Sequence, residues 1–361
     1  MMATQLVCVI VLLSPVVADP SFSISKSLFK NYDAGMRPVC NSTNGTVTVT
    51  LDLAIRQLIG LDEPSQIIKL VVWVSMNWHD CRLKWSPELY DGIGKIVVPA
   101  ERAWLPDMTL YDRISRGFEE IHGLRAIIYS DGTVSYNFPV ITESSCKVNV
   151  KHFPFDSQEC KLIFSSWVYG GSEINTVYGT PYADLDNMDT NVEWEVVSVP
   201  AVRHVVKYAC CVVPWPDVTY YLELKRKSAY YVFQIIIPCS LISALGMLSF
   251  ILPPESGEKV SVGVTVLLSQ AVFLMLIGDL LPPSSETLPI IAIYFDFAMI
   301  LIGFACLTAV ITLKVFYGEN KAIPNWTRSF FFGTLAKMVR VSVPTRKAIK
   351  VGSLPPTESQ V

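Results

Sequence analysis

The chain has 361 residues, a formal net charge of −3, 51% hydrophobic residues and a mean hydropathy of +0.39. This is too apolar for an ordinary soluble domain of this length, so part of the chain is expected in lipid. The four histidines lack metal-ligand spacing, and the sequence has neither a nucleophile elbow nor a phosphate-binding loop. We therefore expect no enzyme, no metal and no cofactor. Without a basic patch outside a short tail, nucleic acid is not an expected partner either.

Residues 1–18 have an apolar centre and end in the small residues Val17 and Ala18. This pattern predicts a cleaved secretory signal peptide. No Lys or Arg precedes the apolar run, which leaves a short membrane anchor as the alternative. Secretion would place the cysteines in an oxidising compartment. Asn41 and Asn44 begin sequons and are the predicted glycosylation sites.

Residues 19–229 are predicted to form an extracellular domain, a β-sandwich of the immunoglobulin-like type. Apart from a short amphipathic helix expected over 25–32, alternating stretches are broken by Gly, Pro, Asn and Asp. Residues 46–53 are the plainest strand. In 70–78 the even-numbered residues, Leu70 to Trp78, share a face that would fill the core, so Trp73 points away from it.

Cys146 and Cys160 enclose thirteen residues that include the sequence Phe153, Pro154, Phe155 and Asp156. A bridge between these cysteines would disfavour the unfolded chain by about 3 kcal/mol in the chain-entropy model. The proline between two aromatic rings predicts a rigid apolar turn, which we expect to press on the membrane domain.

Cys210 and Cys211 are adjacent, so their Cα atoms lie about 3.8 Å apart. The usual range for a disulfide is about 4.4 to 6.8 Å, and a bridge here requires a distorted peptide. Strain at a loop tip is typical of functional sites. Two unlinked thiols are the alternative.

Three apolar runs in residues 230–317, at 231–252, 260–281 and 290–315, are long enough to cross a bilayer as helices. After Leu313 the chain carries eight basic against two acidic residues, so the tail, residues 318–361, is predicted to be cytosolic. An extracellular amino end and a cytosolic tail require an odd number of crossings, and three predicted helices satisfy this.

The middle run carries one polar stripe with charge at both ends and hydroxyls between. Its members are spaced by three and four residues and are predicted to line a pore: Glu258, Ser261, Thr265, Leu268, Val272, Met275 and Asp279. A lone helix cannot shield such a stripe, so several copies around an axis are implied. Leu268 and Val272 would form the constriction, and the terminal carboxylates would favour cations. Alternatively, the hydroxyls only bond backbone carbonyls inside a helix bundle.

Five segments together resemble the Cys-loop receptors, which are pentameric ligand-gated channels, and most closely their nicotinic acetylcholine receptor branch. The resemblance covers residues 25 to about 341. Its segments are the Cys146 to Cys160 loop, Trp104 to Tyr111, Ser166 to Gly171, Tyr208 to Cys211, and Gly257 to Gly263.

The resemblance implies a ligand site between neighbouring subunits. One face would be Tyr111, Trp167, Tyr208, Cys210, Cys211 and Trp215, and the opposite face Trp73, Ile127, Ser135 and Asn137. Such an aromatic box suits a quaternary ammonium, because π faces attract a weakly hydrated cation. The turn 153–156 and Arg226 are expected to transmit binding to the loop 282–289.

The implied partners are four further subunits, a small cationic ligand, permeant cations and membrane lipid. The implied location is the plasma membrane, at a postsynaptic site. The sequence departs from the pattern where Trp215 replaces a tyrosine and Ile163 replaces a lysine thought to couple with Tyr208 and Asp217. Cys40 and Cys81 are additional, and as the remaining pair they are predicted to bridge.

The family also has a fourth membrane helix, and no fourth apolar run follows here; residues 323–341 instead resemble its amphipathic helix on the inner membrane surface. An accessory or ligand-binding subunit that does not conduct by itself is therefore the alternative to a conducting one.

Overall fold

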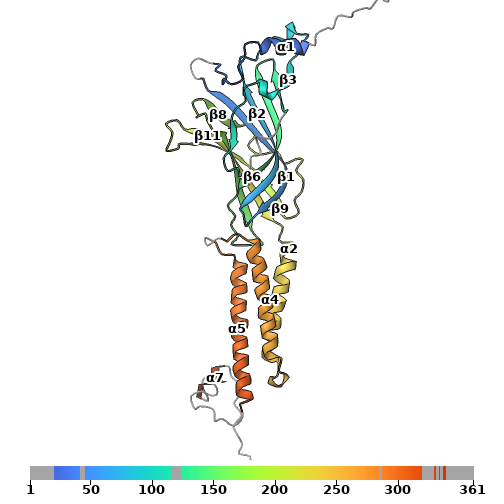
Figure 1. Ribbon diagram of the computed structural model, residues 1–361, viewed down its shortest axis with the longest axis vertical. Coiled ribbons are helices and arrows are strands. Elements are labelled where there is room, and N and C mark those ends of the chain that lie inside the picture. Colours follow the sequence, from blue (N-terminus) through green and yellow to red (C-terminus); the bar gives the residue numbers. More distant parts are fainter. Residues whose placement is uncertain are drawn as a thin grey trace, which may run out of the picture.

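The computed structural model describes residues 20–40, 45–114, 123–283, 287–318, 329–330, 333 and 336–338. The predicted signal peptide, both predicted glycosylation sites and most of the predicted helix 323–341 lie outside these residues. Figure 1 shows the described parts as an elongated molecule, with strands at one end and long helices at the other.

The strands form two sheets, as predicted for a β-sandwich. The six-stranded sheet has the order β3-β5-β6-β2-β1-β8, and the second sheet has the order β10-β11-β7-β4 with β9 also paired to β11. The strands of the first sheet are β1 (Val47–Asp62), β2 (Ile67–His79), β3 (Lys95–Pro99), β5 (Arg125–Tyr129), β6 (Thr133–Ser145) and β8 (Ile174–Tyr178). Those of the second are β4 (Met108–Leu110), β7 (Ser157–Ser166), β9 (Trp194–Ser198), β10 (Ala201–Val206) and β11 (Trp215–Arg226).

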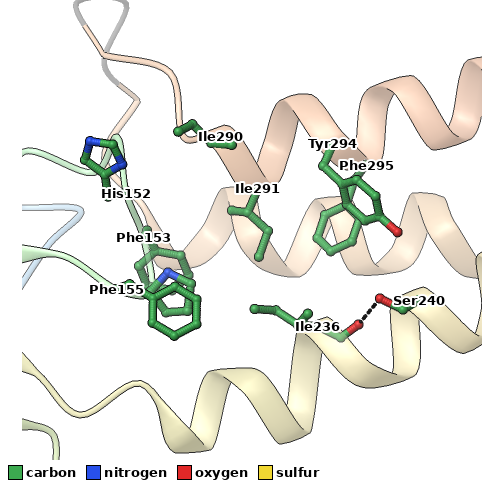
Figure 2. Close-up of a pocket in the computed structure, with 10 residues that line it drawn as sticks. His152, Phe153, Phe155, Ile236, Ser240, Ile290, Ile291, Tyr294 and Phe295 are labelled. Carbon is green, nitrogen blue, oxygen red and sulfur yellow. Dashed lines mark hydrogen bonds between the residues drawn. The ribbon is translucent and has the colours of Figure 1, made fainter.

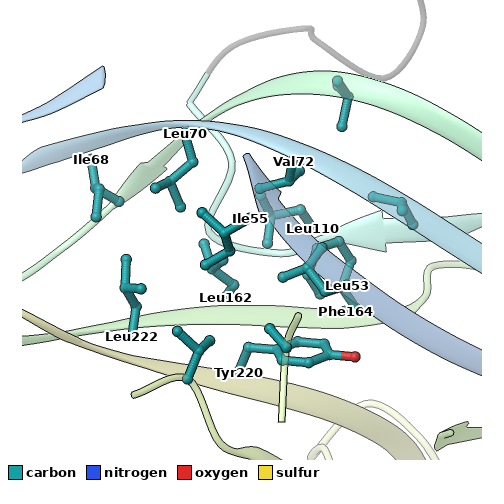
Figure 3. Close-up of a cluster of buried hydrophobic side chains, with 14 of the residues drawn as sticks. Leu53, Ile55, Ile68, Leu70, Val72, Leu110, Leu162, Phe164, Tyr220 and Leu222 are labelled. Atoms are coloured by element: carbon teal, nitrogen blue, oxygen red, sulfur yellow. The ribbon is translucent and has the colours of Figure 1, made fainter. Parts of the chain in front are cut away.

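The core lies between the sheets, where alternate residues of facing strands meet. Leu53 and Leu70 of the first sheet face Leu162, Phe164 and Tyr220 of the second in Figure 3. The predicted inward set of β2 is confirmed, since Leu70, Val72, Val74, Met76 and Trp78 are all buried. Trp73 is 51% exposed, as its outward position requires.

The N-terminal helix lies earlier in the chain than predicted. Helix α1 spans Pro20–Leu28 rather than 25–32, and Ile24 is its buried residue. Tyr32, at the end of the predicted helix, makes tertiary contacts instead. Its hydroxyl donates to Asp80 at 2.8 Å, and the Arg82 guanidinium stacks on its ring at 4.4 Å. These contacts hold Tyr32 against the sandwich.

All three predicted disulfides are present. Cys40–Cys81 ties the N-terminal segment to the end of β2, Cys146–Cys160 joins β7 to the segment before it, and Cys210–Cys211 lies between β10 and β11. Cα separations are 5.6, 5.0 and 3.7 Å respectively. The short 3-10 helices η1 (Pro87–Leu89) and η2 (Ala100–Arg102) complete the outer domain.

Three helical segments among the described residues are long and apolar enough to cross a membrane. They span Ala229–Ile251, Lys259–Leu280 and Ile290–Phe316, within two residues of the predicted ends. The first comprises α2 (Ala229–Tyr231), the π-helical turn η3 (Val232–Ile236) and α3 (Ile237–Ile251); η4 (Pro254–Ser256) leads to α4 (Lys259–Leu280), followed by α5 (Ile290–Phe316). The short helix α7 (Ala336–Met338) falls inside the predicted 323–341.

Candidate functional site

Trp167 stands on an anchored segment directly after β7. The Asp107 carboxylate accepts hydrogen bonds from the Ser166 hydroxyl at 2.6 Å, the Trp167 amide at 3.1 Å and the Val168 amide at 2.7 Å. Charge-assisted bonds of this kind are stronger than neutral ones. The Trp167 side chain is nevertheless 67% exposed, so a large apolar ring is held in fixed position at the surface.

Tyr111, directly after β4, lies beside that ring. Its amide donates to the Ile163 carbonyl at 2.9 Å, and its hydroxyl donates to the Ser166 carbonyl at 2.9 Å. The two rings meet edge to face, with centroids 5.8 Å apart and planes at 86°. Partial burial raises the pKa of Tyr111, so its hydroxyl stays protonated and neutral at physiological pH.

The segment between β10 and β11 carries the remaining residues of this face. Tyr208 is 39% exposed, its carbonyl accepts the Cys211 amide at 3.2 Å, and Trp215 opens β11 opposite Val206. Partial burial raises the pKa of Tyr208, and the nearby Tyr111 raises it further. In Figure 1 the olive-coloured chain beside the β11 label projects sideways from the sandwich.

A glycine lets this hairpin approach the Trp167 segment. The Gly171 amide donates to the Pro214 carbonyl at 2.9 Å, and a Cβ on Gly171 would lie 2.7 Å from that oxygen. Any other residue would push the two segments apart. The structure thus joins Tyr111, Trp167 and the base of the Tyr208 to Trp215 hairpin into one surface, which we call the aromatic face.

The other four predicted ligand residues lie on a different sheet. Trp73 pairs with Pro139, and Ser135 pairs with both Asn77 and Ile127, so these side chains and Asn137 share the outer face of the six-stranded sheet. Ser135 is only 8% exposed and offers little surface to a ligand. We call this set the Trp73 face.

The position of the replaced lysine is filled by a different network. Ile163 pairs with Thr219, and the buried Asp217 accepts from the Thr219 hydroxyl at 2.9 Å. His204 Nδ1 lies 3.0 Å from Asp217 Oδ1, and its Nε2 lies 3.3 Å from the Tyr221 hydroxyl. Sequence reasoning missed His204, whose place opposite Asp217 depends on the pairing of β10 with β11.

Arg226, at the end of β11, is the centre of a buried charge cluster above the membrane helices. It forms ion pairs with Asp156 at 2.8 Å, Glu193 at 2.8 Å and Glu63 at 2.7 Å. The guanidinium also stacks over the Trp194 ring at 4.1 Å. Glu63, Glu193 and Trp194 were not predicted, because they converge only in the tertiary structure.

The predicted turn 153–156 contacts the helices. The Phe153 ring packs edge-on against Tyr231 at 4.9 Å, while the Lys151 carbonyl accepts the Ile290 amide at 3.1 Å. Figure 2 shows Phe153 and Phe155 facing the starts of the first and third spans across a cavity of about 640 Å³. The contacts of the turn and of Lys151 just before it therefore run to Tyr231 and Ile290, and Ile290 directly follows the predicted partner loop 282–289.

The predicted pore stripe is the unburied side of α4. All seven of its residues are exposed, including Leu268 at 67%, and the buried residues of α4 are Gly263, Val266, Gln270 and Ile277. The Thr265 hydroxyl does donate to the Ser261 carbonyl at 2.8 Å, as the alternative interpretation expects. Such a bond leaves the hydroxyl oxygen free to accept, so it is compatible with a water-facing surface.

The structure combines a two-sheet domain with three helices long and apolar enough to cross a membrane, and the buried Arg226 cluster lies where the two parts meet. Sequence profiles described as "Neurotransmitter-gated ion-channel ligand binding domain" and "Neurotransmitter-gated ion-channel transmembrane region" match residues 22–228 and 235–359. The chain belongs to this family, as a nicotinic acetylcholine receptor-like subunit. Members are membrane-embedded ligand-gated channels with an extracellular ligand-binding domain, not enzymes.

Three relatives show the extent of the similarity. The chain is 39% identical over 313 residues to "Neuronal acetylcholine receptor subunit alpha-9" of Gallus gallus, covering 86% of this chain and 64% of the relative. It is 38% identical to "Neuronal acetylcholine receptor subunit alpha-10" of Homo sapiens, covering 88% and 70%. Identity to "Acetylcholine receptor subunit alpha-like 2" of Drosophila melanogaster is 37%, covering 94% and 61%.

Proposed function

We propose that this chain is one of five subunits of a cation-selective channel that opens when a small organic cation binds between neighbouring subunits outside the cell. One observation carries the proposal: the aromatic face and the Trp73 face lie on different sheets of one chain. A ligand box that uses both faces therefore needs two chains. On this proposal the channel acts in the plasma membrane, at a postsynaptic site, with lipid around its helices.

The chemistry of the aromatic face supports a cationic ligand. Trp167 and Tyr208 present exposed rings, and the Asp107 carboxylate nearest to Trp167 is already occupied by three donors. A neutral aromatic surface attracts a quaternary ammonium, which is poorly hydrated and needs no hydrogen bond. Each ring contributes about 0.5 to 2 kcal/mol to such binding.

The ends of α4 support cation selectivity. Glu258 immediately precedes the helix and Asp279 lies in its last turn, and both are exposed on the pore stripe. Repeated around an axis, these carboxylates would form two negative rings that attract cations and repel anions.

The test is current recorded from cells that express the full chain, with acetylcholine and tetramethylammonium as probes. We expect ligand-activated currents whose reversal potential follows external sodium. Glu258→Ala should weaken cation selectivity, whereas Glu255→Ala, an exposed carboxylate outside the stripe, should leave the reversal potential unchanged. A reversal potential that follows chloride would contradict the pore assignment.

A second candidate is a subunit that binds ligand without opening a pore of its own. It is favoured by the His204–Asp217 network, which occurs where the resemblance expects a coupling lysine at position 163. Binding of the probes by the full chain, with current only after co-expression with another subunit, would support this candidate. Current from the chain alone would exclude it.

A further inference from the structure

The positively charged side chain of Arg56 lies on the Trp73 ring. The guanidinium carbon of Arg56 is 4.5 Å from the centroid of the Trp73 ring. This distance is well inside the range of a cation–π contact, about 6 Å. Of the four residues predicted for the Trp73 face, Trp73 is the aromatic one, so cation binding on this face depends on its ring.

Strand alternation and the pairing of β1 with β2 give Arg56 this position. In β1 the inward residues alternate up to Ile55, and the next inward residue is Leu58, because the register shifts between Ile55 and Gln57. Arg56 directly follows the inward Ile55 and therefore lies on the outer side of the sheet, two residues from Ala54, which pairs directly with Trp73. The bulge that follows leaves Arg56 without a directly opposite residue on β2.

Within the described part of the chain, the charge of Arg56 is not neutralised by an ion pair. Among the described residues no carboxylate pairs with its guanidinium, although the Asp189 amide donates to the Arg56 carbonyl at 2.8 Å and fixes its backbone. The full positive charge therefore acts on the indole.

Two cations compete for one ring. The negative potential of an indole face attracts a single cation, and a ligand cation at the same distance on the other face would lie at twice 4.5 Å, about 9 Å, from the guanidinium. Repulsion between unit charges at that distance lowers affinity about 2- to 20-fold, from the dielectric of water to that of a protein surface.

We propose that Arg56 is a specificity-determining residue that weakens the Trp73 face as a site for cationic ligands. The inference rests on the proposed function and sharpens it. The chain is suited to supply the aromatic face, while the facing tryptophan comes from another kind of subunit that has no cation on its ring. Receptors assembled from this chain alone are then less sensitive to organic cations than mixed ones.

The experiment measures concentration–response curves for acetylcholine and tetramethylammonium on the full chain. Arg56→Gln should lower the half-maximal concentration about 2- to 20-fold. Arg56→Lys, which keeps the charge, should stay near the wild-type value. Arg102→Gln is the matched control, because Arg102 stacks on Phe29 at 4.2 Å in the same manner but on a different ring.

A second pair of variants tests whether Arg56 acts through the ring. In a Trp73→Leu background, Arg56→Gln should change sensitivity less than twofold, since the shared ring is gone. An equal shift in both backgrounds would overturn the inference, as would an Arg56→Gln variant that is unchanged or less sensitive than wild type. Absence of any response in all variants would instead overturn the proposed function.

Discussion

Arg226 and Asp156 are joined twice, through side chains and through backbones. Arg226 Nε donates to Asp156 Oδ1 at 2.8 Å, and the Arg226 amide donates to the Asp156 carbonyl at 3.2 Å. The pair connects the end of β11, which leads into the first membrane helix, with the turn 153–156, just after Lys151, whose carbonyl accepts the Ile290 amide of α5. We expect a movement of the sandwich to reach the helices through this connection.

Loss of the arginine should therefore uncouple and destabilise the protein. Arg226→Gln leaves the buried Asp156 without its ion-pair partner, which costs about 3 to 5 kcal/mol. We expect a lower midpoint of thermal unfolding for the purified full chain and a smaller maximal current. Lys225→Gln removes the same charge from an exposed neighbour and should change neither. An unfolding midpoint equal to that of wild type would refute the role of Arg226.

Asp107 should control ligand affinity without contacting ligand. Asp107→Asn replaces an oxygen acceptor with a donor, so one of the bonds to Ser166, Trp167 or Val168 is lost. The loss of one such bond costs about 1 to 2 kcal/mol of binding free energy, so the half-maximal concentration of tetramethylammonium should rise about 5- to 30-fold. Glu88→Gln, at an exposed position in η1, serves as the control. Equal sensitivity of the Asp107 variant and wild type would show that the segment holds its position without the carboxylate.

Leu268 should set the barrier to opening if the stripe lines the pore. Leu268→Thr makes the apolar constriction easier to wet, so we expect resting current and a lower half-maximal ligand concentration. Leu307→Thr makes the same change on α5, where Leu307 is also exposed, and should have little effect. The readout is holding current with and without ligand. Matching effects of the two variants would count against a pore-lining Leu268.

Asp131 should give the outer domain a defined acid sensitivity. Its carboxylate accepts the amide of Thr133 at 2.8 Å and the hydroxyl at 2.9 Å, and these bonds, the amide first, lower the pKa of Asp131 below 3.8. Because the pKa is lower in the folded state, this stabilisation is complete above the ordinary pKa and is lost as pH falls through the lowered value. The difference in unfolding midpoint between wild type and Asp131→Asn should be constant above about pH 5 and shrink on further acidification. A constant difference throughout would contradict the shift.

Alternation made the sandwich predictable. The strict change of side in β2 from Leu70 to Trp78 follows from the strand period of two, and it gave both the buried set and the outward Trp73. Local pattern was less informative at the amino end, where α1 begins five residues before the predicted start. There Tyr32 is held by Asp80 and Arg82, which no local pattern contains.

The candidate site was also predictable only in part. The aromatic residues of the predicted site were proposed from their segments, but the partners that orient them in the structure were not. His204 meets Asp217 through strand pairing. Glu63, just after β1, and Glu193, just before β9, meet Arg226 from separate parts of the chain. Arg56 reaches Trp73 across the pairing of β1 with β2.

The sequence by itself determined the class of each segment: the strands by period two and the spans by length and apolarity. The predicted ligand residues followed from the resemblance of short segments to a known family. Tertiary structure alone decided which charges meet and which aromatic rings share a face. The physical reason is the distance along the chain over which each interaction acts. Backbone conformation and burial follow from neighbouring residues, whereas a cation on a ring or a carboxylate beside a guanidinium depends on strand order and register, which join residues far apart in the chain.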